Sequence, residues 1–386
     1  MRTGRLALAF RRVAQPERRR SHLTAHMATR PPRQPLSTLL ALCTLAAILG
    51  SSHAYSGGVA EQDANASVHA ERDHAQAPPP SCAGGTPGAD DRCGLGHDDD
   101  CCASLPVPGG TFNRLNDPRY PASVSSFHLD KYMVTVGRFR RYLEETGGPT
   151  QASPPPAGAG AHPKIPDSGW DAAWNTMLPA TTAEMKRALV CDPYGWPTWT
   201  DAPAANEDKP IVCATWLELF AFCAWDGGRL PTQAEMNYAA AGGDEQRLYP
   251  WGSSPITSED AAFCCQGEGT TSLPCEDAFP PWSLIHCTTD DLAPVGSFPR
   301  GAGRWGQLDL AGEAYKVTRD AADDDRPLVP CDDCSRLDNH AALRVAHGGS
   351  FVAAGYRQTT TYRAPYETDG RHYYVSAMCA RDLPGP

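Results

Sequence analysis

Fifteen cysteines in a chain of 386 residues restrict the folds open to it more than any other feature of the sequence. One of them, Cys43, lies in an apolar stretch near the N-terminus, and the other fourteen are spread from Cys82 to Cys379. In an exported chain, an even number of cysteines indicates a framework of disulfides rather than a set of reactive thiols. The compartment that the sequence indicates therefore decides how the cysteines are interpreted.

The N-terminal 54 residues have the features of a secretory signal. An apolar run rich in small residues (LSTLLALCTLAAIL, residues 36–49) follows two arginines and precedes the sequence SHA, which ends at Ala54. The run is short for a membrane span, and SHA resembles a signal-peptidase site. We expect residues 1–54 to be removed and the mature protein, beginning at Tyr55, to be secreted or periplasmic and without a membrane span. An uncleaved anchor is the alternative, and Met27 is an alternative start because the basic segment of a signal is normally short.

Removal of this segment makes the chain strongly acidic. Residues 1–54 hold nine arginines and one acidic residue, so 25 basic and 44 acidic side chains remain, a net charge of −19. Such a chain repels nucleic acids and anionic lipids, so no nucleic-acid partner is expected. The fourteen remaining cysteines are expected to be paired in disulfides.

The mature chain is predicted to consist of a linker and a folded region. Residues 55–104 are polar, rich in proline, glycine and acidic residues, and nearly free of large apolar side chains, so they are predicted to be disordered. The acidic run HDDD at residues 97–100 is interpreted as part of this solvated linker rather than as a cation site. Residues 105–386 have a globular composition, and length alone allows them to form one domain or two.

Four helices are predicted in the folded region from their start and stop signals. Thr232 and Glu235 form a capping box at the start of one helix, and Gly242 ends it in a left-handed conformation. The other three helices follow Thr135, the pair Thr181 and Glu184, and the pair Thr215 and Glu218. Glycines, prolines and short apolar runs dominate elsewhere. The predicted fold class is therefore α+β, irregular and rich in loops.

Four longer segments carry a specific pattern. They are FHLDKYMVTVGRFRRY (127–142), WLELFAFCAWDGGRLPTQAEMNYAAAGG with YPWG (216–252), GQLDLAGEAYKVTRD (306–320), and RVAHGGSF through CARD (344–382). In this order they resemble the sulfatase-modifying-factor family, whose namesake is the formylglycine-generating enzyme. The resemblance spans about residues 105–382, which favours one domain. It implies a disulfide-braced, loop-rich variant of the C-type-lectin-like fold.

The resemblance also implies an activity whose key residues are missing here. The family's enzyme oxidises a cysteine of a sulfatase peptide to formylglycine, with copper held by two thiolates five residues apart after a GGS-aromatic turn. Thiolates suit Cu(I). In GGSFVAAGYRQ these positions fall on Ala353 and Gln358, whose methyl group and amide do not hold cuprous ion, so neither copper nor catalytic residues are expected. Ser350 stands where the family has a serine beside its oxygen pocket, and Tyr315 stands where it has a tryptophan.

A calcium loop of the family is also altered. Its oxygen ligands correspond to Asp309, Gly312 and Ala314, but Lys316 replaces the carboxylate, and residues 262–263 lack the asparagine-led pair of the family's other calcium site. Calcium sites are built from oxygen ligands, and an ammonium repels a divalent ion. Calcium is therefore not expected to stabilise this loop. Lys316 either reaches the loop's acceptors as an internal cation or points to water.

One disulfide follows from the resemblance. In the family, the cysteine of the AxCxW helix pairs with a cysteine near the end of the chain, and these positions are Cys223 and Cys379 here. A second family disulfide would need cysteines near Ala240 and Arg363, and both are absent.

Cys331 and Cys334 form a CxxC pair, which is interpreted as a local structural disulfide. No second CxxC lies nearby, which argues against a zinc site, and Asp332 and Asp333 would raise the pKa of a free thiol. Two pairs of cysteines are adjacent in the sequence, Cys101 and Cys102, and Cys264 and Cys265. Adjacent cysteines are too close to bridge each other, so each member of a pair is expected to form a disulfide with a different segment.

These observations favour an exported protein of this family that is non-catalytic and acts as a binding or structural module. Its ligand is unknown, with a peptide and a glycan as the candidates. Two alternatives remain. One is a peptidyl-cysteine oxidase that generates formylglycine with thiols from elsewhere in the chain. The other is a thiol–disulfide exchanger that uses Cys331 and Cys334.

Overall fold

The structure is a computed structural model, which describes residues 78–83, 85–90, 92–191, 196–265, 287–322 and 326–383. The predicted signal region and residues 55–77 of the predicted linker lie outside the described residues. Within the part that is described, no helix combines the length and the apolar character needed to cross a membrane.

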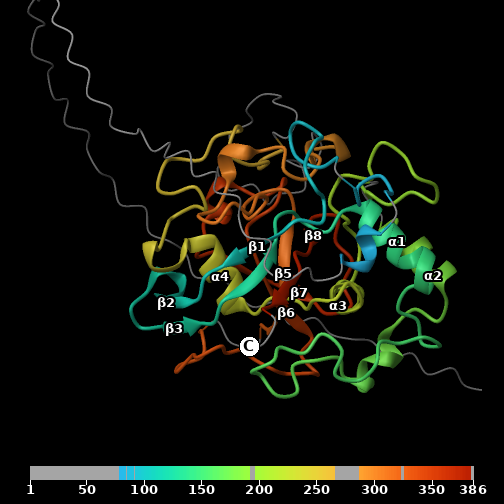
Figure 1. The fold of residues 1–386 in the computed structure, drawn as a ribbon, viewed down its shortest axis with the longest axis horizontal. Helices are drawn as coiled ribbons and strands as arrows, with labels where there is room; N and C mark the ends of the chain where they lie inside the picture. Colours follow the sequence, from blue (N-terminus) through green and yellow to red (C-terminus); the bar gives the residue numbers. More distant parts are fainter. Residues whose placement is uncertain are drawn as a thin grey trace, which may run out of the picture. The chain divides into compact units, whose positions relative to one another are not determined.

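Nine strands form three sheets in the described part of the chain (Figure 1). The largest has the order β7-β6-β5-β8, in which β5 pairs antiparallel with β6 and parallel with β8. Its strands are β5 (Tyr315–Ala321), β6 (Leu343–His347), β7 (Arg363–Glu367) and β8 (Val375–Ser376). The others are β1-β4-β9, with β1 (Ser104–Val107), β4 (Phe127–Asp130) and β9 (Ala380–Asp382), and the hairpin of β2 (Gly110–Asn113) and β3 (Pro121–Val124).

The described residues contain four α-helices, as the sequence predicts. They are α1 (Val136–Thr146), α2 (Thr182–Ala188), α3 (Trp216–Trp225) and α4 (Gln233–Ala241). Short 3₁₀ helices make up the connections: η1 (Pro80–Cys82), η2 (Arg114–Asn116), η3 (Ala172–Met177), η4 (Gly243–Glu245), η6 (Thr289–Asp291), η7 (Pro299–Gly301) and η8 (Gly355–Gln358). The mixture of short strands, few helices and long connections confirms the α+β, loop-rich fold class.

The helix caps also agree with the sequence, with one exception. Complete capping boxes begin α3 and α4, and Gly242 ends α4 with φ 66°. At α2, Thr181 accepts from the N–H of Glu184, but the Glu184 carboxylate accepts from Ala180 instead of Thr181. The box predicted there is therefore only half formed.

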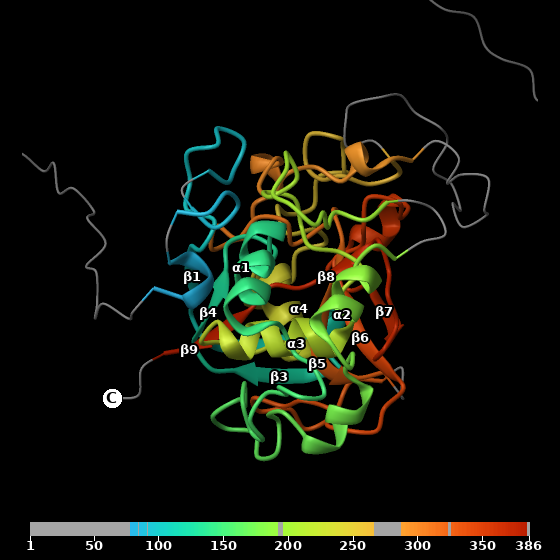
Figure 2. The same cartoon turned by 90° about the vertical axis from the view of Figure 1, so that its right-hand side faces the viewer.

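Helices α3 and α4 are buried in the centre of the fold. Figure 2 shows both helices between the β1-β4-β9 sheet and the four-stranded sheet. Every residue of α4 is buried, and eight of the ten residues of α3 are. The ring of Trp174 packs edge-on against Trp216 and Phe220 of α3, at centroid distances of 5.2 and 5.6 Å. Because each apolar side chain withdrawn from water contributes about 1.5–3 kcal/mol, this core is the main source of stability.

The described part of the predicted linker, residues 78–83, 85–90 and 92–104, forms defined contacts and is not disordered. Helix η1 is anchored by Ser81, whose N–H donates to Asp226 (3.0 Å) and whose hydroxyl accepts from Arg138 (3.0 Å). Disulfides join Cys82 to Cys102 and Cys93 to Cys101. Asp99, in the acidic run assigned to solvent, pairs with Lys131 and accepts from Tyr132. Disulfides and ion pairs fix a segment that has too few apolar residues to fold alone.

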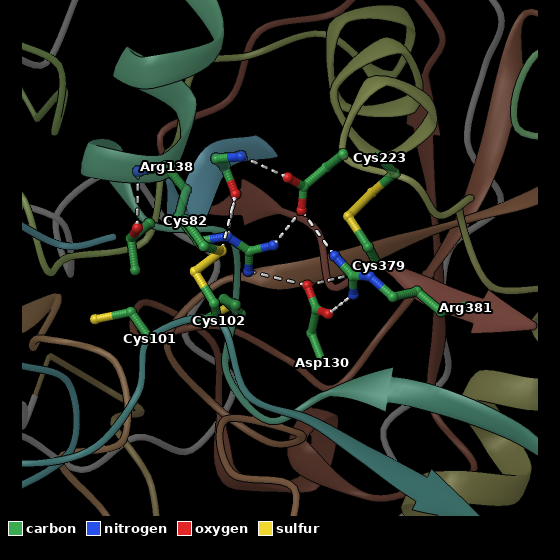
Figure 3. A network of polar contacts seen from close by, with 12 residues as sticks. Cys82, Cys101, Cys102, Asp130, Arg138, Cys223, Cys379 and Arg381 are labelled. Atoms are coloured by element: carbon green, nitrogen blue, oxygen red, sulfur yellow. Dashed lines mark hydrogen bonds and ion pairs between the residues drawn. A yellow bond between two sulfur atoms is a disulfide. The ribbon is translucent and has the colours of Figure 1, made fainter. Parts of the chain in front are cut away.

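A buried ion network joins this segment to the rest of the fold (Figure 3). The Arg138 guanidinium, on α1, lies 3.0 Å from Asp130 and 2.6 Å from Asp226 and is fully buried. Arg381 of β9 pairs with the same two carboxylates. The Cys223–Cys379 disulfide lies beside the network and links α3 to the C-terminal segment. The network therefore ties η1, α1, β4, β9 and the end of α3 together.

Glu235 provides a prediction about acid stability. Its carboxylate accepts two hydrogen bonds from Arg229 (2.7 and 2.6 Å) and one from the N–H of Thr232 (2.8 Å). Burial alone would raise the pKa of Glu235, but Arg229, with His162, lowers it far below its usual value. A lowered folded-state pKa adds stability above the unfolded pKa of about 4.3, and this stability is lost as the pH falls through the folded value.

We expect Glu235→Gln to lower the free energy of unfolding by about 1.5–3 kcal/mol at pH 7, because bonds to a charged group are lost. The deficit should shrink as the pH falls below about 4.3, because the carboxylate of the unfolded chain then binds a proton and the native one does not. Urea unfolding at several pH values measures this. Glu184→Gln, at the matching position of α2 but exposed, is the control. Parallel pH curves for wild type and Glu235→Gln would contradict the prediction.

Candidate functional site

The loop after β6 carries the positions where the resemblance places the thiolates. It turns through Gly348 and Gly349, both with positive φ (88° and 65°). A Cβ atom on Gly348 would lie 2.3 Å from the carbonyl oxygen of Leu310, and one on Gly349 would lie 2.0 Å from the amide oxygen of Gln358. Only glycine fits here, because a side chain would meet both a strained backbone and neighbouring atoms.

The Gln358 side chain is fully occupied in holding this loop. Its amide oxygen accepts from the N–H of Gly312 (2.8 Å), and its amide nitrogen donates to the carbonyls of Ser350 (3.1 Å) and Ala353 (3.4 Å). It therefore bridges two loops, residues 309–314 and 348–358, within a buried environment. Its amide nitrogen and its amide oxygen are therefore both engaged in hydrogen bonds to the backbone.

The other thiolate position offers no metal ligand from its side chain. Ala353 is buried, and its carbonyl accepts from the N–H of Cys264 (3.1 Å). The Cys264 sulfur lies 3.6 Å from the same carbonyl oxygen, but Cys264 is disulfide-bonded. The sequence did not indicate this neighbour. The residues at the two positions do not fit a cuprous ion, since neither Ala353 nor Gln358 supplies a thiolate and the sulfur nearby is oxidised.

Ser350 and Tyr315 line the interior beside these positions. Ser350 is fully buried, and its hydroxyl has no hydrogen-bond partner among the described residues. The ring of Tyr315, at the start of β5, packs 5.2 Å from Tyr366 and 6.4 Å from Tyr362 and Tyr374. Burial raises the pKa of Tyr315, so its hydroxyl stays protonated at neutral pH. A cluster of neutral tyrosines fills this side of the loop.

Lys316 lies inside the altered calcium loop. It is fully buried, and its ammonium donates to the carbonyl of Gly312 (3.1 Å). The alternative in which Lys316 points to water is therefore wrong. Asp309 faces the same interior, where its carboxylate accepts from the N–H groups of Gly296 (2.9 and 3.2 Å) and Met133 (3.4 Å). No hydrogen bond joins Lys316 to the carbonyl of Ala314 among the described contacts.

Glu313 adds a second carboxylate that the sequence did not single out. One of its oxygens accepts from the N–H of Ala293 (3.0 Å), and the other has no partner in the described part of the chain. Burial raises the pKa of both Asp309 and Glu313, and repulsion from Asp309 raises that of Glu313 further. Burial lowers the pKa of Lys316, and its attraction to the two carboxylates partly opposes these shifts. A lysine side chain therefore occupies the loop that resembles the calcium site, and this residue does not fit as a calcium ligand.

Residues 262–263 also fail to provide a calcium site. Ala262 is buried, and its carbonyl accepts from the N–H of Glu313 (3.3 Å). Neither Ala262 nor Phe263 carries a side-chain oxygen, so this segment packs against the Lys316 loop without the ligands that calcium requires.

The described disulfides include the two pairs that were predicted from the sequence. Cys223 is bonded to Cys379, the pair that the resemblance implies, and Cys331 is bonded to Cys334. The members of the adjacent pairs join different segments, since Cys101 pairs with Cys93, Cys102 with Cys82 and Cys265 with Cys287. A further disulfide, not indicated by the sequence, joins Cys191 to Cys213. The contacts described for Cys331 and Cys334 are with Ser123 and Arg114, away from the loop of Ala353.

A groove of about 490 Å³ opens next to η8, the helix that ends with Gln358. Its lining includes Tyr356, Tyr362, the threonines at 359 and 361, and Val345 of β6. Tyr356 is 53% exposed. The volume lies within the range of about 300–1,000 Å³ that is typical of ligand pockets.

Comparisons with known proteins agree with this picture. Residues 97–383 match the family model described as the sulfatase-modifying factor enzyme 1-like domain. The formylglycine-generating enzyme of Bos taurus is 26% identical over 307 residues, which make up 72% of this chain and 74% of that protein. The protein named inactive C-alpha-formylglycine-generating enzyme 2, also from Bos taurus, is 24% identical over 71% of this chain and 86% of its own length. The solved structure of PvdO from Pseudomonas aeruginosa has a TM-score of 0.46 and 19% identity, and covers 72% of this chain and 94% of its own.

Proposed function

We propose a function from one premise: this chain belongs to the sulfatase-modifying factor family. It is an exported member that lacks the copper-dependent oxidation of cysteine and acts as a binding module for a peptide segment, which lies in the groove beside η8. The six disulfides among the described residues are consistent with an extracellular or periplasmic protein, because such bonds persist in oxidising compartments.

The hydrogen bonds of Gln358 are the main support for the proposed loss of oxidase activity. Its amide is bonded to three backbone groups of the two site loops, so it serves as a structural bridge at a position where a thiolate would have to be free. The nearby sulfur of Cys264 is in a disulfide and is not a thiolate ligand. The Bos taurus relative named as inactive supports the same reading, since it aligns over a similar share of the chain.

The groove favours a peptide over a glycan. Its lining includes the apolar residues Leu115, Val345, Ala364 and Pro365. Apolar side chains of a peptide gain by burial against such a surface, whereas the hydroxyls of a glycan do not. Tyr356 and Tyr362, with ring centroids 6.0 Å apart, provide aromatic surface at the rim, and tyrosines are frequent anchors in interfaces.

The first test concerns chemistry. We expect no conversion of a Cys-x-Pro-x-Arg peptide to the aldehyde when it is incubated with the mature protein, copper, oxygen and a thiol reductant. Mass spectrometry of the peptide measures the product, with a no-protein sample as the control. Aldehyde formation above that control would refute the loss of oxidase activity.

The second test concerns binding. A phage-displayed peptide library selected on the mature protein is expected to yield peptides that Tyr356→Ala binds about tenfold more weakly, a loss of about 1.4 kcal/mol, as measured by calorimetry. Met177→Ala, an exposed apolar side chain on η3, is the control and should bind like wild type. Peptides insensitive to Tyr356→Ala, or selective binding of oligosaccharides on a glycan array, would argue against the peptide groove.

A further inference from the structure

The Cys331–Cys334 disulfide lies at the wall of a second pocket, on the side of the β2–β3 hairpin. The pocket has a volume of about 560 Å³, and its lining includes Phe112, Ala122, Gln246, Pro330 and Cys331. Ser123 of β3 donates its N–H to the carbonyl of Cys331 (3.0 Å), which fixes the disulfide against the hairpin. Cys331 is buried, at 6% exposure, and is one of the residues that line this pocket.

A buried guanidinium contacts the other sulfur. Arg114, on η2, is 2% exposed, and its Nη1 donates to Cys334 Sγ at 3.5 Å. Its Nη2 donates to the carbonyl of Leu328, and its Nε has no hydrogen-bond partner within the described residues. The pKa of Arg114 is lowered to about 10, first by burial, so the guanidinium keeps its charge at neutral pH. No ion pair with a carboxylate is described for Arg114, although Asp320 attracts it at longer range.

The two aspartates inside the CxxC sequence form hydrogen bonds with neighbouring serines. Asp332 accepts from the hydroxyl of Ser123. Asp333 accepts from the N–H and hydroxyl of Ser125 (both 2.6 Å) and pairs with Lys164 (3.0 Å). Both carboxylates are thus bonded to groups other than the sulfurs, and the expectation that they raise the pKa of a free thiol stays a prediction.

The charged groups that act on Arg114 are one carboxylate, Asp320, and two guanidiniums, Arg336 and Arg363. The Asp320 carboxylate accepts from Gln233 N–H (2.8 Å), Ser335 hydroxyl (2.9 Å) and Arg336 N–H (2.7 Å), so it is already well satisfied. Arg336 and Arg363 lie close enough to lower the pKa of Arg114 by repulsion. A cationic environment of this kind stabilises a thiolate relative to a thiol.

We propose that Cys331–Cys334 is a redox-active disulfide that exchanges with the dithiol of a peptide or protein, with Arg114 stabilising Cys334 as the leaving thiolate. This activity is separate from the peptide groove beside η8 and goes beyond the proposed function. It also explains why an arginine is buried against a sulfur without a carboxylate partner at bonding distance.

The exchange balances in two steps. A thiolate of the substrate attacks Cys331 Sγ from the pocket, the Cys331–Cys334 bond breaks, and Cys334 departs as a thiolate beside Arg114. The second substrate thiol, after giving its proton to solvent, then attacks the substrate sulfur of the mixed disulfide and displaces Cys331, which takes up a proton. The substrate dithiol is oxidised to a disulfide, and the protein disulfide is reduced. A leaving thiol of low pKa accelerates the first step.

The first experiment follows the equilibrium with glutathione. The mature protein is incubated in buffers of increasing reduced-to-oxidised ratio and alkylated, and its peptides are analysed by mass spectrometry. We expect Cys331–Cys334 to be reduced at a ratio at least tenfold lower than Cys223–Cys379 in the same molecule. In Arg114→Met the ratio needed should rise about tenfold, and Arg114→Lys should restore part of the difference. Equal midpoints for wild type and a folded Arg114→Met would overturn the proposal.

A second experiment remains decisive if Arg114→Met does not fold. In Cys331→Ser, Cys334 is a single free thiol, and its rate of alkylation by iodoacetamide is measured against pH. An ordinary cysteine has a midpoint near pH 8.5. We expect a midpoint at least one unit lower, and a synthetic peptide with two cysteines should be oxidised by one equivalent of wild-type protein. A midpoint of 8.5 or above, or no peptide oxidation, would show that the disulfide is only structural. The peptide-binding proposal is not affected by either result, since its test measures Tyr356.

Discussion

Replacing Arg138 with methionine is expected to lower the free energy of unfolding by about 3–5 kcal/mol, because it leaves buried carboxylates without their counter-charge. Asp130 and Asp226 are both fully buried, and each accepts from Arg138 and from Arg381. Removing one of the two guanidiniums leaves two carboxylates to share one positive charge. The Ser81 hydroxyl also loses its donor, so η1 should detach from α1.

Urea unfolding under non-reducing conditions measures this effect. Arg141→Met is the matched control, because Arg141 lies on the same helix, is partly exposed and pairs with Glu145 one turn away. An exposed pair of this kind contributes at most about 0.5 kcal/mol. Hydrogen exchange of residues 80–83 should increase in Arg138→Met and not in Arg141→Met. If the two variants unfold at the same urea concentration, the network does not hold the N-terminal segment.

What the sequence revealed was the part of the fold that depends on neighbouring residues. Thr135, Thr215 and Thr232 cap their helices as expected, because capping involves atoms only three residues apart. The end of α4 at Gly242 also depends only on neighbouring residues, because it requires a left-handed backbone at one position. That Ala353 and Gln358 carry no thiolate is likewise evident from the sequence, whereas their assignment to the family's copper positions stays a prediction.

What the sequence could not reveal depends on partners far along the chain. Ser81 is held by Arg138 and Asp226, which lie 57 and 145 residues away, so composition alone indicated a disordered linker. The aspartates of the CxxC sequence were judged by proximity in sequence, but their carboxylates are bonded to Ser123, Ser125 and Lys164. Charge within a motif says little about a thiol until the direction of each side chain is known.

Lys316→Met is expected to be the other strongly destabilising substitution, by about 3–5 kcal/mol near pH 7, because it removes a buried cation from a site with two buried carboxylates. Without Lys316, the carbonyl of Gly312 loses a donor, and Asp309 and Glu313 repel each other without an intervening positive charge. Lys186→Met, on the surface helix α2, is the control and should change stability little.

The loss of stability in Lys316→Met should depend on pH, because the buried groups in this loop have shifted pKa values. Burial already raises the pKa of Asp309 and Glu313, and Lys316 opposes that rise, so their folded-state pKa values should rise further in the variant. A raised carboxylate pKa contributes stability that is present below the unfolded pKa of about 4 and lost as the pH rises through the folded value. Burial also lowers the pKa of Lys316 to about 7, so its own charge is lost as the pH rises above that value. Lys316→Met should therefore be furthest from wild type near pH 7 and closer to it both at pH 4 and at pH 9. Adding Glu313→Gln should recover part of the loss near pH 7.

Calcium provides the remaining comparison, because an ion and the ammonium of Lys316 would compete for the same acceptors. Wild-type protein is expected to show no rise in melting temperature with millimolar calcium, whereas a ligand at a hundred times its dissociation constant would add about 2.7 kcal/mol. In Lys316→Met the ammonium is gone and two carboxylates remain, so a small calcium-dependent rise is expected in the variant alone. A clear rise in wild type, protecting residues 309–316 from hydrogen exchange, would mean that Lys316 leaves the loop to admit the ion, and the internal-cation interpretation would then be wrong.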